Sequence, residues 1–426
     1  MAKKTINKEL TGAQDLYNFL FEACNIIRGP VSQDNFKDYI TPLLYYKRIS
    51  DVYDEETEEA LISSGGDKEY ASLPEQHRFV IPDGCHWQEV RERTENLGAA
   101  IVGAMRQIEI ANPDTLYGVL SMFSSQKWTN KAILNDSKIR DLIEHLSKRK
   151  LGNKDYPADL MGDAYEILLK KFADDSKAQA GEFYTPRSVV RLLVHILDPQ
   201  PGETVYDPAC GSGGMLIEAI RYMHDDSLCC GSIFGQEKNV VNAAIAKMNL
   251  FLHGASDFNV MQGDTLRDPK ILQGGNIAKF DCVIANPPFS LENWGATEWS
   301  SDKYKRNIYG TPSDSCGDYA WIQHMICSMS SGKGRMAVVM PQGILFRGTK
   351  EAEIRKQLVE SDLIEAVVTL GDKLFYGTGL SPCFLIIRRM KQAHHSGRIL
   401  MIDGSKILTQ KRAQNILEEN DIDRLY

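Results

Sequence analysis

The stretch of sequence that decides the fold is Val205-Tyr206-Asp207-Pro208-Ala209-Cys210-Gly211-Ser212-Gly213-Gly214. Its apolar start is typical of a strand, and its glycine-rich end is typical of a turn that leads from a strand into a helix. Glycines in such a turn allow positive φ and let a ligand approach the backbone closely. The turn fits any nucleotide-like cofactor, but no lysine follows as in a P-loop, which argues against a bound triphosphate.

On both sides of this stretch, from about Asp163 onwards, short apolar runs alternate with helical stretches. Predicted strands are 204–206, 232–235, 258–261, 282–285, 335–340, 364–370, 383–387 and 399–402. Predicted helices are 187–197, 213–221, 239–252, 319–329 and 350–360. The alternation predicts the α/β fold class, with a parallel, doubly wound sheet that binds its ligand at the carboxyl ends of the strands.

The N-terminal part of the chain reads as helical. Apolar stripes of helical spacing begin at Leu16 and Phe36, with Pro42 expected to bend the second helix or lie near its start. Residues 55–86 are expected to be irregular, and helical patterning returns at 87–110 and 139–146. We therefore predict a helical domain over 1–155, an α/β domain over 156–404 and a helical tail over 405–426, with its stripe at 407–417.

Composition places the chain among globular proteins with more than one domain. It has 426 residues, of which 43% are hydrophobic and 25% charged. No run approaches the roughly 18 apolar residues of a membrane helix, and the N-terminus lacks the apolar run of a secretory signal. The nine cysteines form no CxxC pair, so we expect reduced thiols, a cytoplasmic protein and no metal site.

The charge balance limits how the chain can hold nucleic acid. Lys and Arg total 49 against 57 Asp and Glu, which gives a net charge of −8. A protein that grips DNA alone by neutralising phosphates normally carries a basic face. This chain is therefore expected to need a partner to hold DNA.

Two further acids follow the next two predicted strands. Glu237 closes the second strand, at a position where an acid usually binds a ribose diol, and Asp264 closes the third, where it can accept from an adenine amino group. Each acid alone also fits a helix cap or a solvated loop. Together with Asp207, the three acids favour an adenosyl ligand.

The fourth predicted strand ends in Asn286-Pro287-Pro288-Phe289. Two prolines after a strand are rare, because proline cannot donate to a ladder and fixes its own φ. Such a rigid turn can aim the Asn286 side-chain oxygen and a proline carbonyl outward, where they accept the two hydrogens of a planar amino group. The nitrogen lone pair is then directed at an electrophile, without a strong base. A base stacked on Phe289 has to be rotated out of the duplex to reach this turn.

These motifs carry a resemblance to a known family. The turn 286–289 resembles the catalytic motif of amino-group methyltransferases, and 207–214 resembles their S-adenosylmethionine (SAM) loop. The segment 181–187 resembles the one that precedes the SAM loop in one permutation of adenine methyltransferases and helps to wall the SAM site. The segments 340–348, 354–355 and 374–378, with 28–29 and 46–51 near the start, are similar to the modification subunit of type I restriction–modification systems. Nearly the whole chain is covered by the resemblance.

The resemblance implies a SAM-dependent DNA adenine N6-methyltransferase with a Rossmann-like fold. It assigns Asn286, Pro287, Pro288 and Phe289 to the target adenine. It assigns to SAM the residues Tyr184, Thr185, Asp207, Gly211, Ser212, Gly213, Glu237 and Asp264. It also implies double-stranded DNA as substrate, a separate specificity subunit that reads the sequence, a second copy of the modification subunit in the complex, and a restriction subunit that can join.

Two features depart from that pattern or extend it. Family members usually continue into further helices that pack on the specificity subunit, whereas this sequence ends at Tyr426, so we expect a shortened or compact tail. The polar segment 290–318, with two tryptophans and Lys303-Tyr304-Lys305-Arg306, is interpreted as a lid over the rotated base, with plain disorder as the alternative.

Three other functions fit part of the sequence. A stand-alone adenine methyltransferase would need its own recognition domain, and no large domain follows the α/β region. A SAM-binding scaffold without catalysis is disfavoured by the intact turn 286–289. A methyltransferase of protein glutamine or RNA could share that turn, but the helical N-terminal domain and the series 346–348 argue against it.

Overall fold

The structure is a computed structural model that describes residues 2–116, 118–120, 125–175, 185–223, 231–255, 257–375, 381–411 and 415–426. The chain divides into two compact units, one of residues 1–179 and 247–254 and the other of residues 180–246 and 255–426. Within the described ranges, none of the helices combines the length and the apolar composition that a membrane crossing needs.

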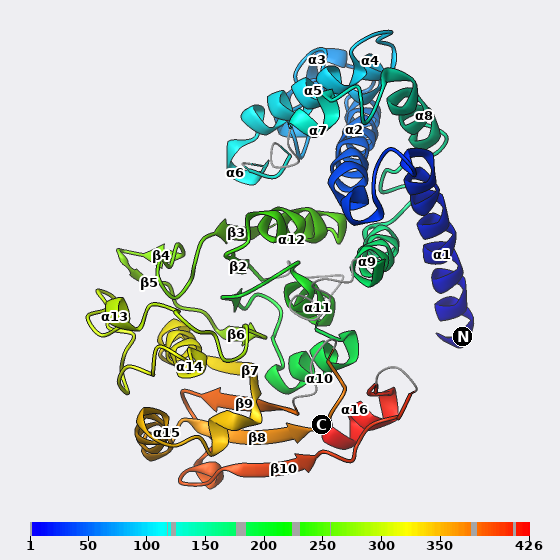
Figure 1. The fold of residues 1–426 in the computed structure, drawn as a ribbon. Helices are drawn as coiled ribbons and strands as arrows, with labels where there is room; N and C mark the ends of the chain where they lie inside the picture. The colour runs from blue at the N-terminus through cyan, green and yellow to red at the C-terminus, as the bar shows by residue number, and fades with distance from the viewer. Residues whose placement is uncertain are drawn as a thin grey trace. The chain divides into compact units, whose positions relative to one another are not determined.

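The first unit is helical (Figure 1). Its helices are α1 (Ala2–Ile27), α2 (Phe36–Ser63), α3 (Lys68–Ala71), α4 (Trp87–Arg91), α5 (Leu97–Ala111), α6 (Pro113–Leu116), α7 (Ser125–Thr129), α8 (Asp136–Leu146) and α9 (Ala158–Asp175), with 3-10 turns η1 (Gln33–Asn35) and η2 (Pro74–Gln76). Contacts group α9 with this unit, because it packs along α1. The predicted domain boundary between residues 155 and 156 stays a prediction.

Helix α2 is longer than the sequence predicted. The expectation of irregular structure from residue 55 was wrong, because α2 continues to Ser63. Its last turns are rich in glutamate, which favours helix even where the surface is polar. Pro42 lies inside α2, near its start as expected, and the buried Lys47–Asp51 ion pair is one helical turn further on. Asp51 also accepts from the amide of Leu151 at 2.6 Å, which ties α2 to the segment after α8.

The second unit is built on an eight-stranded sheet. Its strands are β1 (Val205–Asp207), β2 (Ile233–Glu237), β3 (Phe258–Gln262), β6 (Cys282–Ala285), β7 (Arg335–Pro341), β8 (Ile364–Leu370), β9 (Pro382–Arg388) and β10 (Leu400–Gly404), in the order β10-β8-β9-β7-β6-β1-β2-β3. A separate hairpin pairs β4 (Leu272–Gln273) with β5 (Asn276–Ile277). The predicted strands are all present, with ends that differ by one or two residues.

One strand departs from the expected parallel arrangement. Strand β9 runs antiparallel between β7 and β8, and the other neighbouring pairs of the sheet are parallel. A strand that is buried on both faces has an apolar sequence whichever way it runs, so its composition could not reveal its direction.

Both faces of the sheet are covered, as a doubly wound sheet requires. Residues 336–340 of β7 are all fully buried, so neither face of that strand meets solvent. Helix α10 packs on β6 and β7, while α14 packs on the other face of β7 beside a cluster that contains Met336 and Val338. The helices are α10 (Arg187–Leu197), α11 (Gly214–Met223), α12 (Val240–Leu252), α13 (Ala296–Trp299), α14 (Asp318–Ser328), α15 (Lys350–Glu360) and α16 (Glu419–Leu425), with 3-10 turns η3 (Gln342–Leu345) and η4 (Ala393–His395).

The order of strands fixes where a ligand can bind. From β1 the chain proceeds outward through β2 and β3 on one side, and then returns to β6 on the other side of β1 (Figure 1). The crossovers on the two sides of β1 therefore run in opposite directions. In open α/β sheets the crevice at such a switch point, beyond the carboxyl ends of the strands, is the usual ligand site. Asp207 and Asn286 lie at the ends of the two strands that meet there.

The tail does not fold as predicted. The expected helix over 407–417 was wrong, since in its described residues Thr409 bridges to Ile416 as in a β-ladder, and the helix α16 begins later, at Glu419. Glu418 and Asp421 form a capping box that fixes this start, a local signal stronger than the weak apolar stripe upstream.

Candidate active site at the switch point

The glycine loop, residues 208–213, joins β1 to α11 at the switch point. Gly211 has a φ of 54° and Gly213 a φ of 85°, a region that residues with a side chain rarely adopt. The Gly213 amide donates to the carbonyl oxygen of Cys210 at 2.8 Å, which closes the turn just before α11 begins. Positions 211 and 213 therefore need glycine for the chain to turn tightly here.

Asp207 ends β1 and is buried, with only 2% of its surface exposed. Its Oδ1 accepts from the amide of Ala209 at 2.9 Å. Burial raises the pKa of Asp207 to about 8, and the charge of Glu237 acts in the same direction. At neutral pH the carboxyl is therefore poised to gain charge when a cation or several hydrogen-bond donors arrive.

Glu237 ends β2 and ties that strand to the glycine loop. Its two oxygens accept from the amide of Gly211 at 3.0 Å and from the amide of Asn239 at 2.7 Å. Burial raises the pKa of Glu237, while these hydrogen bonds oppose the shift. Two buried carboxyls of adjacent strands, those of Asp207 and Glu237, thus lie beside the same glycine loop.

Asp264 follows β3 and is held by local contacts. Its Oδ1 accepts from the amides of Leu266 at 3.1 Å and Arg267 at 3.3 Å, and its Oδ2 pairs with Lys238 Nζ at 2.9 Å. These contacts fit the alternative in which Asp264 caps a local turn and has no role in ligand binding. Because the Lys238 side chain is 72% exposed, the ion pair is weak and leaves the carboxyl open to exchange partners.

The turn after β6 holds its asparagine in one orientation. Asn286 Nδ2 donates to the Thr185 hydroxyl oxygen at 2.8 Å, whereas Asn286 Oδ1 is buried and accepts no hydrogen bond from the described residues. A buried acceptor without a partner costs free energy, about 1–3 kcal/mol, and such groups persist mainly where function needs them. Pro287 is buried beneath the turn, and Pro288 is exposed.

An aromatic pair lies beside this turn. Phe289 is half-buried, and its ring centroid lies 6.5 Å from that of Phe375 with the planes at 57°. Phe375 belongs to the segment 374–378, to which the family resemblance assigns no role. The contact joins two positions far apart in the chain, so no local pattern could have revealed it.

The other predicted site residues are placed less completely. Ser212 lies in the glycine loop between Gly211 and Gly213. Thr185 is described, and its hydroxyl contacts Asn286. Tyr184 lies outside the described residues, as do positions 376–378 of the series that follows Phe375.

The segment 290–318 leaves the turn and returns to it. At its base the Gly317 amide donates to the Leu291 carbonyl oxygen at 2.9 Å, and the Asn293 amide donates to that of Asp314 at 2.9 Å. Trp294 and Trp299 are buried and stack edge to face. The segment is therefore folded, which contradicts the alternative of plain disorder, and its action as a lid stays a prediction.

Arg306 anchors that segment from inside. It is 2% exposed and donates to the carbonyl oxygens of Thr265 at 2.9 Å and Leu266 at 2.8 Å, in addition to an ion pair with Asp302. It also approaches Nδ1 of His324 at 3.3 Å, and burial lowers the pKa of His324 well below its usual value. The buried imidazole therefore has a low affinity for a proton, which disfavours it as a general base.

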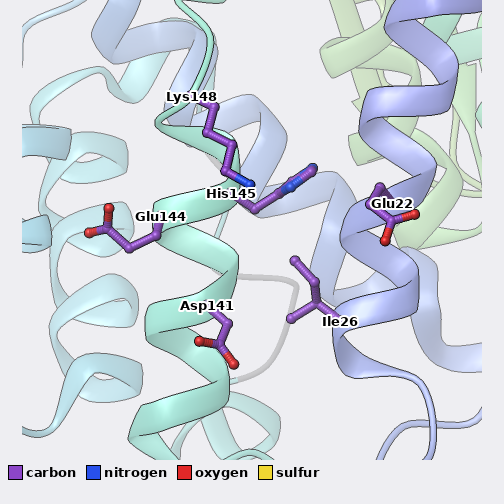
Figure 2. Close-up of a pocket in the computed structure, with 6 residues that line it drawn as sticks. All are labelled: Glu22, Ile26, Asp141, Glu144, His145 and Lys148. Carbon is purple, nitrogen blue, oxygen red and sulfur yellow. The ribbon is translucent and has the colours of Figure 1, made fainter.

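A hollow of about 410 Å³ lies in the helical unit, between α1 and α8 (Figure 2). Its lining residues are Glu22, Ile26, Asp141, Glu144, His145 and Lys148. Glu144 is bound by Arg91, and His145 hydrogen-bonds the Phe19 carbonyl oxygen at 2.8 Å. The lining is mainly acidic and would repel phosphates and carboxylates, so the hollow is not the candidate site.

Comparisons with known proteins match both units. Residues 156–426 fit the family model described as N-6 DNA Methylase, and residues 16–146 fit the one described as HsdM N-terminal domain. The chain is 34% identical over 404 residues to the Type I restriction enzyme MjaVII methylase subunit of Methanocaldococcus jannaschii, which covers 90% of this chain and 67% of that protein. It is 28% identical over 394 residues to the EcoKI methylase subunit of Escherichia coli, covering 88% and 67%.

Solved structures agree. The methyltransferase subunit of a type I restriction–modification system from Streptococcus thermophilus has a TM-score of 0.80 and 26% identity, covering 97% of this chain and 92% of that one. Fold and family together define the class: a SAM-dependent methyltransferase of the DNA adenine N6 type. Within that class, the chain belongs to the family of modification (methylase) subunits of type I restriction–modification systems, as its motifs predicted.

Proposed function

We propose that this chain transfers a methyl group from SAM to the N6 amino group of an adenine rotated out of double-stranded DNA, and that a separate specificity subunit chooses the site. The observation that carries the proposal is the buried Asn286 Oδ1, which accepts no hydrogen bond from the described residues at the end of a central strand. An oxygen in that state suits a donor that arrives with the substrate.

The turn 286–289 would do most of the catalytic work. Asn286 Oδ1 and the carbonyl oxygen of Pro287 would accept the two hydrogens of the exocyclic amino group and fix its plane. Phe289 would stack on the adenine ring, with Phe375 supporting it from the side. Pro288 stiffens the turn and has no amide hydrogen to compete for the acceptors. Catalysis then rests on position and electrostatics, and the amino proton leaves to solvent after transfer.

The glycine loop and its carboxyls would hold the cofactor. SAM supplies an activated methyl group on a positively charged sulfur. Asp207 and Glu237 fit such a ligand, because both are buried carboxyls with raised pKa values that a cation or hydroxyl donors would stabilise in the charged form. Gly211, Ser212 and Gly213 would allow close approach of the ligand to the backbone. Asp264, Thr185 and Tyr184 complete the proposed set.

DNA would be held mainly by the assembly. The net charge of −8 gives this chain little attraction for phosphates, so a specificity subunit that binds DNA would supply it. We infer two modification subunits with one specificity subunit in the methyltransferase, to which a restriction subunit can add. The family relationship supports this inference, since the relatives are subunits of type I enzymes.

Replacement of Asn286 by alanine tests the chemistry. In the complex with a specificity subunit, Asn286→Ala should lower the single-turnover rate of methyl transfer at least about 100-fold, because the amino group loses a fixed acceptor. The SAM dissociation constant, measured by calorimetry, should change by less than about threefold. Each measurement is made with and without the specificity subunit.

The control is Asn420→Ala, an exposed asparagine of helix α16. It should methylate at the wild-type rate. A normal rate for Asn286→Ala would disprove the role of the turn. Site-specific methylation by the chain alone would instead favour a stand-alone enzyme.

A further inference from the structure

A buried carboxylate lies directly behind the proposed catalytic turn. Asp318 is the first residue of α14 and has no exposed surface. Its Oδ1 accepts from the backbone amide of Ser290 at 2.7 Å. Ser290 follows Phe289 at once and has a φ of 50°, a strained value for a residue with a side chain. The exit of the turn is thus held in an unfavourable conformation by a side chain far away in the sequence.

Arg347 completes this arrangement from a third element. It follows the turn η3 after β7 and forms an ion pair with Asp318. Its Nε also pairs with Glu351 at 2.7 Å, and its Nη1 lies 3.4 Å from the Ser290 hydroxyl oxygen. The guanidinium therefore lies between two buried carboxylates and touches the same residue that Asp318 holds.

Arg347 is itself held in place. Its carbonyl oxygen accepts from Arg355 Nη1 at 2.8 Å, which links the residue to α15. The segment 346–348 resembles the type I modification subunits, but the resemblance assigns it no role in binding or catalysis. Its arginine has a structural partner at the turn 286–289, and the exposed Phe346 beside it has none of these contacts.

We propose that Asp318 and Arg347 are positioning residues for methyl transfer, which lock the exit of the turn 286–289 and so fix the backbone that carries the Phe289 ring. Neither residue touches the substrate. The pair acts through the Ser290 backbone, because a peptide whose amide is fixed cannot rotate without moving the residue before it. This inference rests on the proposed function, which it extends to two residues outside the turn.

The test uses the full chain in complex with a specificity subunit and a duplex that carries its target site. Arg347→Met should reduce the single-turnover rate about 10- to 100-fold, since small displacements of reacting groups have effects of that size. The SAM dissociation constant should stay close to wild type. The melting temperature should fall, because the buried carboxylates of Asp318 and Glu351 lose their cation, so all rates are measured well below it. Arg347→Lys, which keeps a charge beside Asp318, should recover part of the rate. The fluorescence of 2-aminopurine in place of the target adenine should also change, because the base loses its fixed stacking partner.

The matched control is Arg388→Met. Arg388 is a 31% exposed arginine paired with Glu365, against 28% for Arg347, and it lies at the opposite end of the strands from the turn. It should methylate normally. If Arg347→Met does not fold, Asp318→Leu, which has a similar branched shape but no acceptor for the Ser290 amide, decides the question with the same readouts and should also lower the rate.

Three outcomes would overturn the inference. A rate for Arg347→Met equal to that of Arg388→Met would show that the pair does not position the turn. A loss of rate accompanied by an equal loss of SAM affinity, or by unfolding at the temperature of the assay, would show a merely structural role. A wild-type complex that does not methylate at all would refute the proposed function, and this inference with it, before any variant is compared.

Discussion

The two ends of the Asn286 side chain have different surroundings. Its nitrogen donates to the Thr185 hydroxyl, whereas its oxygen is buried and accepts no hydrogen bond from the part of the chain that the structure describes. An amide held in this way presents an acceptor to the site without a choice of orientation. The family resemblance places Thr185 only beside the cofactor. We infer that its hydroxyl also orients the Asn286 amide.

Asp207 should make the stability of the fold depend on pH. Its pKa is raised from 3.8 to about 8 by burial, so the folded state holds a proton that the unfolded state releases. The stabilising contribution is complete below about pH 4 and is lost as the pH rises through about 8. Asp207→Asn, which stays neutral, should lose less stability than wild type over this range.

The measurement is chemical denaturation of the wild type and of Asp207→Asn from about pH 5 to about pH 9. The control is Asp403→Asn, which replaces an exposed carboxyl and should leave the wild-type slope nearly unchanged. Parallel curves for wild type and Asp207→Asn would contradict the assignment of a raised pKa to Asp207. Glu237, whose pKa is also raised, adds a slope of the same sign to both proteins.

Local sequence was sufficient to find the residues at strand ends. Asp207, Glu237 and Asn286 each follow an apolar run, and parallel strands bring their carboxyl ends to one edge of the sheet. It was not sufficient to predict the contacts that Thr185, Asp318 and Phe375 make at the turn 286–289 and its exit, because these contacts join residues distant in the chain. No spacing rule predicts a hydrogen bond across that separation.

At the scale of elements, the segment 290–318 is a folded loop that the buried Arg306 holds from inside. Arg306→Met should destabilise the second unit by about 3–5 kcal/mol, because it leaves the Asp302 carboxylate and two carbonyl oxygens without their donor in a buried place. Denaturant unfolding would measure this loss, and limited proteolysis would localise it to the segment.

Lys303→Met is the matched control, since it removes a cation from the same segment at an exposed position. It should change the free energy of unfolding by no more than about 0.5 kcal/mol. Equal stability of the two variants would mean that the segment does not depend on Arg306.

Element types were easier to predict than their limits and directions. Strand β6 and helices α10 and α15 have the bounds that the pattern gave, because apolar periodicity and the residues that flank it agree there. Helix α2 ran beyond its apolar stripe through a glutamate-rich stretch, and β9 reversed its direction without any change of composition. Intrinsic helix propensity decided the first case, and packing against neighbouring strands decided the second.

At the scale of the whole molecule, charge should govern the interaction with DNA. The chain alone, with a net charge of −8, should bind a duplex weakly, and its affinity should depend little on salt. The complex with a specificity subunit should bind tightly and lose affinity steeply between about 50 and 200 mM salt, as the partner's phosphate contacts release counterions. Fluorescence anisotropy would measure both.

A duplex without the target sequence is the control for the complex, and it should show the same dependence on salt with a lower affinity. Tight binding of the target duplex by the chain alone would contradict the expectation. The helical unit would then have to carry the DNA contact through a local surface that the net charge conceals.

The two-part organisation was evident from the change of sequence texture, since only the second part alternates strands with helices. The grouping of α9 and of residues 247–254 with the helical unit was not evident, because it depends on contacts between distant segments. Periodicity describes which face of an element is apolar, and it does not say which neighbour covers that face.

The closed base of the segment 290–318 has a consequence for how such enzymes diverge. Since Leu291 and Gly317 are joined by a hydrogen bond, the residues between them form a loop whose two ends lie side by side. For a flexible loop each doubling of length adds only about 0.6 kcal/mol of closure entropy, whereas a change near the buried Trp294, Trp299 and Arg306 would disturb their packing. We therefore expect related enzymes to differ in length at the exposed turns of this segment, while its base and the chemistry beside it stay the same.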